Sequence, residues 1–287
     1  MSGIEGVQVV PVDNVIVEKW KSLRKYRQYG PFIETEVRAR QTLNAELALK
    51  MALEEGIDWL LHIDSDELFW IPQPSITSHL TSLASEEIVS ARYINFEAVP
   101  HQQEVTDYFL EVGAFKKPRK LLAKQGINVE ELWQERRKYF NFYNNGKSMC
   151  RVRPDMVPND VHKWRSWQHH IHTTSFYYPC ILHFSCCGYQ YFESKFRKLV
   201  DNGSEATEFG VSMKDKGFSI DYDATMAYRA NDLKKAMEIY QNRIMMSEEK
   251  INHYVSCGIM ERIDIASCLG IKPHNVNWGG RESIRSL

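Results

Sequence analysis

Residues 59 to 69, Trp-Leu-Leu-His-Ile-Asp-Ser-Asp-Glu-Leu-Phe, constrain the fold more than any other stretch, because an apolar run ends directly in acidic side chains. The run from Ile57 to Ile63 is typical of a buried strand. Acidic residues at the carboxyl end of such a strand are typical of a ligand site in an open α/β sheet. Asp64, Asp66 and Glu67 repel one another unless a cation joins them, and Mg²⁺ or Mn²⁺ suits carboxylate oxygens. An acidic turn or helix start explains the same residues, so this stretch alone favours neither interpretation.

The segments before this stretch predict a strand–helix–strand unit. Residues 36 to 55 carry apolar side chains at helical spacing, and Gly56 is placed as the stop of that helix. Residues 7 to 14 have the composition of a strand that ends at Asp13. Parallel strands that each end in an acid would bring both acids to one edge of the sheet, which suits a nucleotide and its metal.

A motif within this unit resembles a known enzyme group. Arg40-Gln41-x-x-Asn44, followed by residues 58 to 69, resembles the core of GT-A-fold glycosyltransferases, in the family-2-like and family-92-like group with the motif DWxxxxDxDEF. Leu68 stands where that group often has an aromatic residue.

Two later segments resemble the same group and occur in the same order. Residues 147 to 154, followed by Val161-His162, resemble its lysine-bearing strand and downstream Val-His pair. Residues 180 to 184, followed by Lys195, resemble its LHY segment and later lysine. The resemblance covers about residues 5 to 200.

The resemblance implies an α/β fold that is GT-A-like (Rossmann-like), with a mostly parallel central sheet flanked by helices. We expect a glycosyltransferase domain over residues 1–200, with its first strand–helix unit missing or shortened, and a helical C-terminal extension over residues 201–287. Within these parts we expect a short helix and loop over 73–85, a strand over 88–96, an irregular polar loop for the acceptor over 97–125, and helices over 231–254 and 258–269.

The implied function is transfer of a sugar from a nucleotide-diphosphate sugar to a hydroxyl of a glycan, protein or small-molecule acceptor. Mn²⁺ or Mg²⁺ would stabilise the negative charge that develops on the leaving diphosphate. The resemblance implies Asp64, Asp66 and His183 as metal ligands, with Asp64 also near the donor ribose. Alone, His183 in its apolar run is more typical of a core histidine.

The donor would bind through further residues of the same motifs. We expect Arg40, Gln41 and Lys147, which lie in the quoted motifs, to bind the donor, and Asp13, as a strand-end acid, to hold the base or ribose. Arg38 and Lys195 are additional cations suited to a diphosphate. For each cation taken alone, ordinary surface solvation is the commoner role, and Asp13 also suits a turn.

An inverting enzyme needs a general base near the acceptor hydroxyl. In the resembling group this base follows the acidic motif and precedes the metal-ligating histidine, which here indicates Asp160 first and His162 next. A loop carboxylate with no catalytic role explains Asp160 equally well, and retention of configuration stays open.

Two other functions remain as alternatives. One is a catalytically degenerate relative that serves as a binding module. The other is a metal-dependent phosphohydrolase, because haloacid-type phosphatases also place two aspartates after a strand; those enzymes have Thr or Val where this sequence has Leu68.

Several conspicuous clusters have an ordinary explanation. The histidines in 169–172 lack a neighbouring acid or cysteine pair, the aromatic residues in 139–143 and 164–167 are more typical of a core than of sugar stacking, and the basic run 116–120 suits an exposed loop. A net charge of −1 gives no indication of nucleic-acid binding.

The composition indicates a cytoplasmic globular protein. Apolar runs are too short for a transmembrane segment, no signal peptide is evident, and the six cysteines form no CxxC pair. A Golgi or other secretory location is the alternative if an N-terminal anchor precedes these residues.

Overall fold

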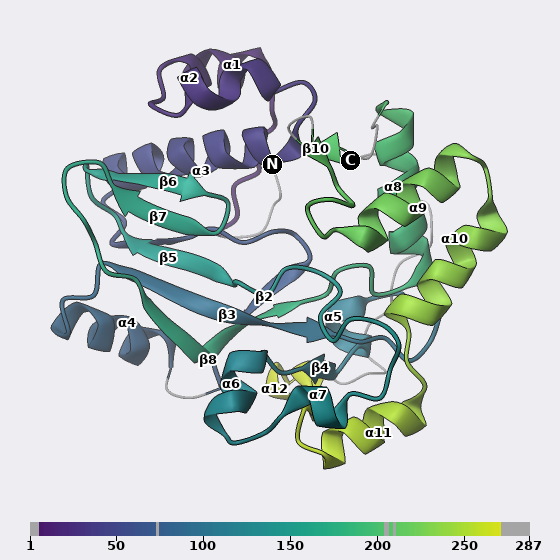
Figure 1. Ribbon diagram of the computed structural model, residues 1–287. Coiled ribbons are helices and arrows are strands. Elements are labelled where there is room, and N and C mark those ends of the chain that lie inside the picture. The colour runs from purple at the N-terminus through teal and green to yellow at the C-terminus, as the bar shows by residue number, and fades with distance from the viewer. Residues whose placement is uncertain (1–5, 73–74, 204–206, 209–210, 271–287) are drawn as a thin grey trace.

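The computed structural model describes residues 6–72, 75–203, 207–208 and 211–270, and it has a mixed α/β architecture (Figure 1). A seven-stranded sheet forms its centre. Its strands are β1 (Trp59–Leu61), β2 (Glu67–Trp70), β3 (Ser90–Ala98), β4 (Ala114–Lys116), β5 (Lys147–Arg151), β8 (Thr174–His183) and β11 (Met260–Arg262). Two separate hairpins consist of β6 (Met156–Asp160) with β7 (Lys163–Ser166), and β9 (Thr207–Glu208) with β10 (Val211–Ser212).

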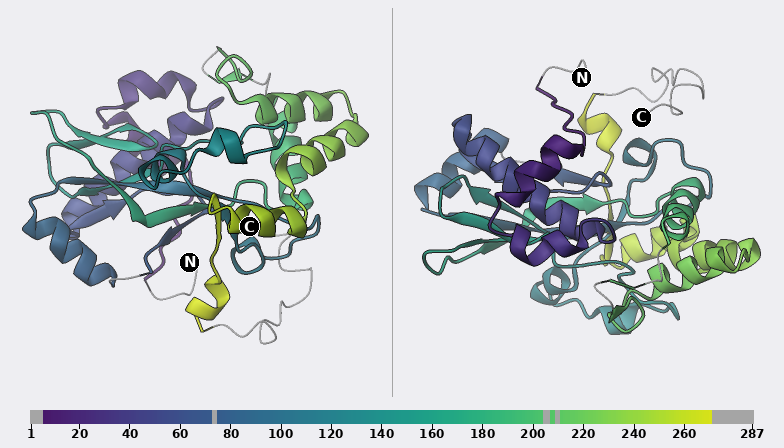
Figure 2. Two further views of the ribbon diagram at one scale, coloured as in Figure 1. Left: turned by 60° about the horizontal axis from the view of Figure 1, so that its bottom comes forward. Right: turned by 90° about the horizontal axis from the view of Figure 1, so that it is seen from above.

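Helices surround this sheet, and two sets of them form compact groups (Figures 1 and 2). The N-terminal group is α1 (Asn14–Lys21), α2 (Tyr26–Tyr29) and α3 (Val37–Glu54), with a 3₁₀ turn over Gly30–Phe32. The group at the far end is α8 (Tyr189–Asp201), α9 (Ser219–Arg229) and α10 (Leu233–Ile239), continued by a π-helical turn over Tyr240–Ile244. The remaining helices are α4 (Ile76–Ser85), α5 (Tyr108–Glu111), α6 (Arg119–Lys124), α7 (Val129–Leu132), α11 (Glu248–Ser256) and α12 (Ile265–Cys268).

The sheet is mostly antiparallel, which corrects the expected parallel arrangement. Within the described residues β3 and β8 form the parallel pair, while β5 and β4 pair with β3, β2 with β8, and β1 with β5 in the antiparallel sense. The reason is that β1 finds its neighbour in β5, which runs back from a later part of the chain. The predicted parallel neighbour, residues 7–13, is not in a strand.

The expected strand over residues 7–14 is therefore wrong. Val7 and Val9 are 51% and 62% exposed, and the chain enters α1 at Asn14. Asp13 caps that helix, because its side chain accepts a hydrogen bond of 3.0 Å from the Ile16 backbone N–H. The acid at the end of the apolar run marks the start of a helix and not the end of a strand.

The helix predicted over residues 36–55 is confirmed as α3, and its end is set by Gly56. That glycine has φ +70°, a left-handed conformation that suits a residue without Cβ. The Ile57 N–H donates to the Ala52 carbonyl at 2.9 Å, which closes the last turn. The following strand is confirmed but is shorter than expected, since β1 covers residues 59–61.

Three predictions for the later chain need correction. The expected polar loop over 97–125 contains β4, whose Phe115 is fully buried, and the short helices α5 and α6. The expected helix over 258–269 contains β11, which pairs with β4 at the edge of the sheet. The expected helix over 231–254 is interrupted after the π-helical turn and resumes as α11. In each of these segments the apolar pattern is too short for sequence spacing alone to distinguish a strand from a helix.

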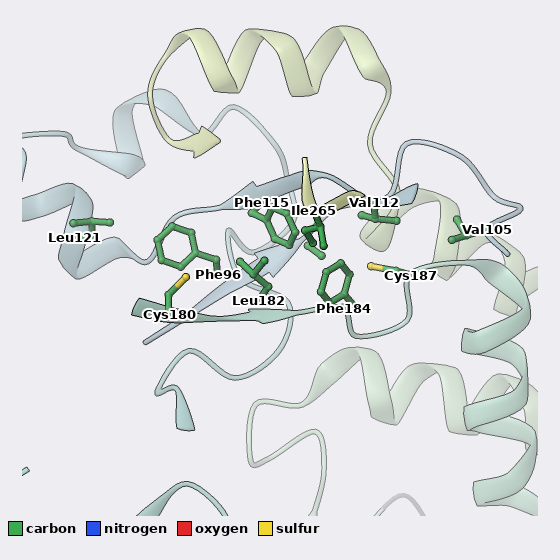
Figure 3. Close-up of a cluster of buried hydrophobic side chains, with 11 residues drawn as sticks. Phe96, Val105, Val112, Phe115, Leu121, Cys180, Leu182, Phe184, Cys187 and Ile265 are labelled. Atoms are coloured by element: carbon green, nitrogen blue, oxygen red, sulfur yellow. The ribbon is translucent and has the colours of Figure 1, made fainter. Parts of the chain in front are cut away.

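One face of the sheet at β3 and β8 packs on an apolar core. Figure 3 shows this cluster, in which Phe96, Leu182 and Phe115 come from neighbouring strands and Ile265 from α12. The next residues along these strands, Glu97, His183 and Lys116, therefore point to the opposite face. The elements after residue 200 join the same body, because α9 and α10 pack on Phe192 and Phe196 of α8.

Of the helices in the described ranges, none combines the length and apolar character needed to cross a lipid bilayer. The six cysteines are free thiols.

Candidate active site

The acidic stretch forms a tight connection between β1 and β2. The Glu67 N–H donates to the Asp64 carbonyl at 3.1 Å, which closes the turn. The Phe184 N–H donates to the Asp66 carbonyl at 2.8 Å, which fixes the turn to the end of β8. The ladder between β2 and β8 places Glu67 directly opposite His183. Antiparallel pairing thus brings the predicted metal histidine next to the acidic motif.

Each carboxylate oxygen of Asp64 is hydrogen-bonded by a protein side chain. Its Oδ1 accepts a hydrogen bond of 2.6 Å from Gln41 Nε2, and its Oδ2 accepts one of 2.6 Å from Lys147 Nζ. Lys147 is buried, and its ammonium also lies 3.5 Å from the Val161 carbonyl oxygen. Two of the residues predicted to bind the donor, Gln41 and Lys147, therefore hold Asp64.

Glu67 lies behind Asp64 and is 4% exposed. Its Oε2 accepts the Asp64 N–H at 2.8 Å and lies 3.7 Å from Lys147 Nζ. Its Oε1 is buried without a hydrogen-bond partner among the described residues. Burial raises the pKa of Glu67 to about 8, although the positive charge of Lys147 opposes that shift.

Asp66 has a different environment, in which its carboxylate is 36% exposed and faces His183 with 3.7 Å between Oδ2 and Nε2. The His183 ring is buried, and burial lowers its pKa although Asp66 acts in the opposite direction. The imidazole is therefore neutral near pH 7, the form that binds metals. Its Nδ1 has no hydrogen-bond partner among the described residues, so packing orients the ring.

His162 follows the β6 strand in the turn to β7 and lies on the cleft. Its Nδ1 is 3.0 Å from the Gly146 carbonyl oxygen. Because a carbonyl only accepts, Nδ1 carries the proton and Nε2 keeps a lone pair. Burial, followed by the charge of Lys147, lowers the pKa of His162 to about 4. The Asp160 carboxylate accepts the His162 backbone N–H at 2.7 Å, so it stabilises this turn.

These groups meet in a cleft of ≈ 1310 Å³ between the N-terminal helices and the α8–α9 region. Most of the residues predicted for the site line it: Arg38, Arg40, Gln41, Asp64, Asp66, His162, His183 and Lys195. Among the other predicted residues, Asp13 caps α1, Lys147 is buried behind Asp64, and Asp160 braces the turn. Arg40 donates to the Ile33 carbonyl at 2.6 Å, and Lys195 pairs with Asp221 at 3.0 Å.

The donor atoms fit a divalent ion in part. In the ranges that the structure describes, no group of three or more His, Cys, Asp and Glu side chains is positioned to hold a metal ion by itself. Asp66 and His183 are a suitable pair, because neighbouring ligands of an octahedral Mg²⁺ lie about 3 Å apart and these atoms are separated by 3.7 Å. Asp64 would have to exchange a protein partner for the ion.

The basic run 116–120, the histidines in 169–172 and the aromatic residues in 139–143 have mainly structural contacts. Within the basic run, Lys116 pairs with Glu97 in the protein interior and Arg119 pairs with Glu130. His169 lies 3.7 Å from Asp155, which Arg153 and Ser166 also bind. Of the aromatic cluster, Tyr139 is core, whereas Phe142 and Tyr143 line the cleft.

Sequence reasoning missed two residues that shape the site, Asn95 and Glu97 of β3. Both are buried, and both bind the loop that carries Phe142 and Tyr143. The available signal was two polar residues two positions apart, which flank the apolar Phe96 near the end of β3. Such a pair on one face of a buried strand needs hydrogen-bond partners.

Two curated proteins of Arabidopsis thaliana, both named glycosyltransferase-like, are similar to this chain. One is 27% identical over 240 residues, which cover 79% of the chain, and the other is 24% identical over 277 residues, which cover 91%. These similarities support a glycosyltransferase family. The matches cover 51% and 52% of the relatives, so the chain spans about half the length of each. No family model matches the sequence, and no solved structure matches the fold.

Proposed function

We propose that this chain is a metal-dependent glycosyltransferase of the GT-A type. It would transfer a sugar from a nucleotide-diphosphate sugar to an acceptor hydroxyl. One observation carries the proposal: Asp64, Asp66, His162 and His183, which come from distant parts of the sequence, line one cleft of ≈ 1310 Å³. The names of the two relatives support the reaction class.

Asp66 and His183 would hold the metal ion, which supplies Lewis-acid stabilisation of the diphosphate. The partial exposure of Asp66 leaves room for phosphate oxygens to complete the coordination. Lys195 is 40% exposed on the same cleft, and its charge suits the diphosphate. Gln41 and Lys147 would fix Asp64, whose carboxylate then accepts a hydrogen bond from the donor or joins the metal.

His162 is the better candidate for the general base. Its Nε2 keeps an acceptor lone pair because Nδ1 donates to the Gly146 carbonyl, and the residue lies on the cleft near Asp64 and Asp66. Nε2 would take the proton of the acceptor hydroxyl as that oxygen bonds to the anomeric carbon. The bond between the anomeric carbon and the diphosphate oxygen breaks, its electron pair stays on the diphosphate, and configuration inverts.

A second candidate is a binding module that retains the fold without catalysis. The observation in its favour is that Lys147 and Gln41 give each oxygen of the Asp64 carboxylate a protein partner, which competes with a bound ligand. A phosphohydrolase using the same acids would release phosphate from simple phosphoesters, which a transferase would not.

Calorimetric titration tests these alternatives directly. UDP, GDP and their sugars would be titrated with and without Mn²⁺ into the wild type, Asp66→Ala and the control Glu238→Ala. Glu238 is a carboxylate on α10 that is 46% exposed and outside the cleft lining. We expect Mn²⁺-dependent binding of one nucleotide that Asp66→Ala abolishes and Glu238→Ala retains. Absence of nucleotide binding to folded wild-type protein would exclude the transferase.

A further inference from the structure

A loop between the core and the cleft, residues 141–146, touches both histidines of the site. The Gly146 carbonyl binds His162 Nδ1 at 3.0 Å. The ring of Tyr143 lies 4.6 Å from the His162 ring and 4.6 Å from the His183 ring, measured between centroids. His183 Nδ1 lacks a hydrogen-bond partner among the described residues, so ring contacts with Tyr143 and Phe142 of this loop contribute to its orientation.

This loop is held by two side chains of β3. Asn95 accepts the Gly146 N–H at 3.0 Å and donates to the Tyr143 carbonyl at 2.8 Å. Glu97 accepts the backbone N–H groups of Asn141 at 2.8 Å and Phe142 at 2.9 Å. The loop backbone is therefore attached at both ends to a rigid central strand.

Gly146 shows how closely the loop approaches that strand. Its φ is +71°, and a Cβ at this position would lie 2.1 Å from the Tyr93 carbonyl oxygen. A side chain at position 146 would require the loop backbone to move away from the backbone of β3. The loop thus has little freedom to adopt a second position next to β3.

Glu97 needs a buried countercharge to make these bonds. Lys116 of β4 supplies it, with 2.7 Å between Nζ and Oε1 and side-chain exposures of 1% and 2%. Such a pair gains little net stability over apolar residues, since both charges lose their hydration. A buried pair that also binds a cleft-lining loop indicates a role in positioning.

Glu97 and Lys116 belong to a continuous polar row across the sheet. Register pairs Glu67 of β2 with His183 of β8, His183 with Glu97 of β3, and Glu97 with Lys116 of β4. Side chains paired in this way lie on one face of the sheet. His183 is therefore flanked directly by the residue that holds the loop.

We infer that Glu97, balanced by Lys116, is a positioning residue that sets the orientation of His162 and His183 through the 141–146 loop. This role rests on the proposed function, in which His162 is the base and His183 a metal ligand. Glu97 itself does not line the cleft and touches no substrate.

Four variants test this inference in ¹⁵N-histidine-labelled protein. Glu97→Gln and Lys116→Gln each leave one buried charge unpaired, whereas the double variant Glu97→Gln/Lys116→Gln leaves none. The matched control is Glu46→Gln, because Glu46 is also buried and accepts two backbone N–H groups, those of Arg24 and Lys25, away from the cleft. The readouts are the ring-nitrogen signals of His162 and His183, the Mn²⁺ affinity in the presence of UDP or GDP, and thermal unfolding.

We expect each single Glu97 or Lys116 variant to shift both histidine signals and to weaken Mn²⁺ binding by about tenfold, as loss of outer support around metal ligands does. The double variant should recover toward the wild type, and Glu46→Gln should lower stability without moving either signal. Unchanged signals in Glu97→Gln, or equal shifts in Glu46→Gln, would overturn the inference. If one of the two single variants does not fold, the double variant decides. Its altered loop hydrogen bonding must still move the histidine signals, but by less than in the single variant that folds. Should the signals shift as expected while no nucleotide binds to the wild type, positioning stands and the proposed function fails.

Discussion

Asp64 and Asp66 are two residues apart in one turn, yet their surroundings differ in almost every respect. Asp64 has a hydrogen bond to each carboxylate oxygen, one of them from a buried ammonium, and is 26% exposed. Asp66 is 36% exposed and has one neutral histidine nearby at 3.7 Å. The comparison teaches that neighbours, more than residue type, assign roles to paired carboxylates. Protein groups hold both oxygens of Asp64, whereas Asp66, in the proposed function, is the carboxylate that a ligand can reach.

The largest effect should come from removing the cation on the Asp64 side. Lys147→Met leaves the Asp64 carboxylate without its countercharge. We expect a loss of about 3–5 kcal/mol in the free energy of unfolding, measured by urea denaturation. The control Lys235→Met, at a residue 60% exposed on α10, should change it by less than about 0.5 kcal/mol. Partial recovery in Lys147→Met/Asp64→Asn would attribute the loss to the unpaired carboxylate, and equal losses in Lys147→Met and Lys235→Met would contradict it.

Metal binding should separate the two aspartates next. Asp66→Asn should weaken Mn²⁺ binding in the presence of nucleotide by more than about 100-fold, equivalent to about 2.7 kcal/mol. Asp64→Asn should weaken it by about tenfold, the effect of a group that supports the ligands. Calorimetry of both variants gives the ratio. If Asp64→Asn were the more damaging, the assignment of the two roles would be reversed.

A smaller effect is expected from the neutral partner of Asp64. Gln41→Leu removes the 2.6 Å hydrogen bond to Oδ1 but keeps the Lys147 pair. We expect a loss of about 1–2 kcal/mol in unfolding free energy, because bonds to charged groups contribute more than neutral ones. Gln28→Leu is the matched control, since Gln28 is exposed on α2 and its side-chain oxygen lies 3.5 Å from Lys25 Nζ. Similar losses in both variants would indicate that the Asp64 contact contributes nothing specific.

A further effect concerns pH and involves Lys147 again, because burial and the charge of Lys147 lower the pKa of His162. The pKa of His162 is lowered to about 4 in the folded protein, against about 6.5 in an unfolded chain. Between these values the unfolded chain binds a proton that the native protein does not, so acidification from pH 6.5 to 4 lowers stability. Urea denaturation at several pH values should show a slope that is shallower in His162→Gln by at most one proton. His62, whose pKa is also lowered to about 4 by burial, remains in both proteins and serves as an internal reference. Identical slopes in both proteins would show that His162 titrates normally.

Local signals in the sequence were sufficient for the helix α3, its Gly56 stop and the acidic turn. Those features depend on spacing and capping within about twenty residues. The prediction of a strand over residues 7–14 was wrong because Asp13 suits a helix cap as well as a strand end. Sequence spacing does not distinguish these two roles. The prediction of a parallel sheet was wrong because long-range packing determines which strands are neighbours. Strand β1 pairs with β5, which begins at Lys147.

The sequence predicted which residues form the candidate site better than it predicted the contacts between them. Asp64, Asp66, His162 and His183 do converge, since motif order carries that information. The sequence did not indicate that Lys147 turns toward Asp64, because two residues separated by 83 positions share no local pattern. The roles of Asn95 and Glu97 depend on the register of β3 with its neighbours, which no local periodicity encodes.

The polar row across β2, β8, β3 and β4 also has a consequence for how the protein is made. Its members stand at positions 67, 97, 116 and 183, so the row is complete only when β8 has been synthesised. During translation the earlier strands leave the ribosome first, with Glu67 and Glu97 lacking the strand that lies between them. Non-local pairing of this kind folds slowly, because a long loop must close before the contacts form. We expect the cleft to appear as one of the last events of biosynthesis, and a chain interrupted before residue 183 to carry the acidic motif without a site.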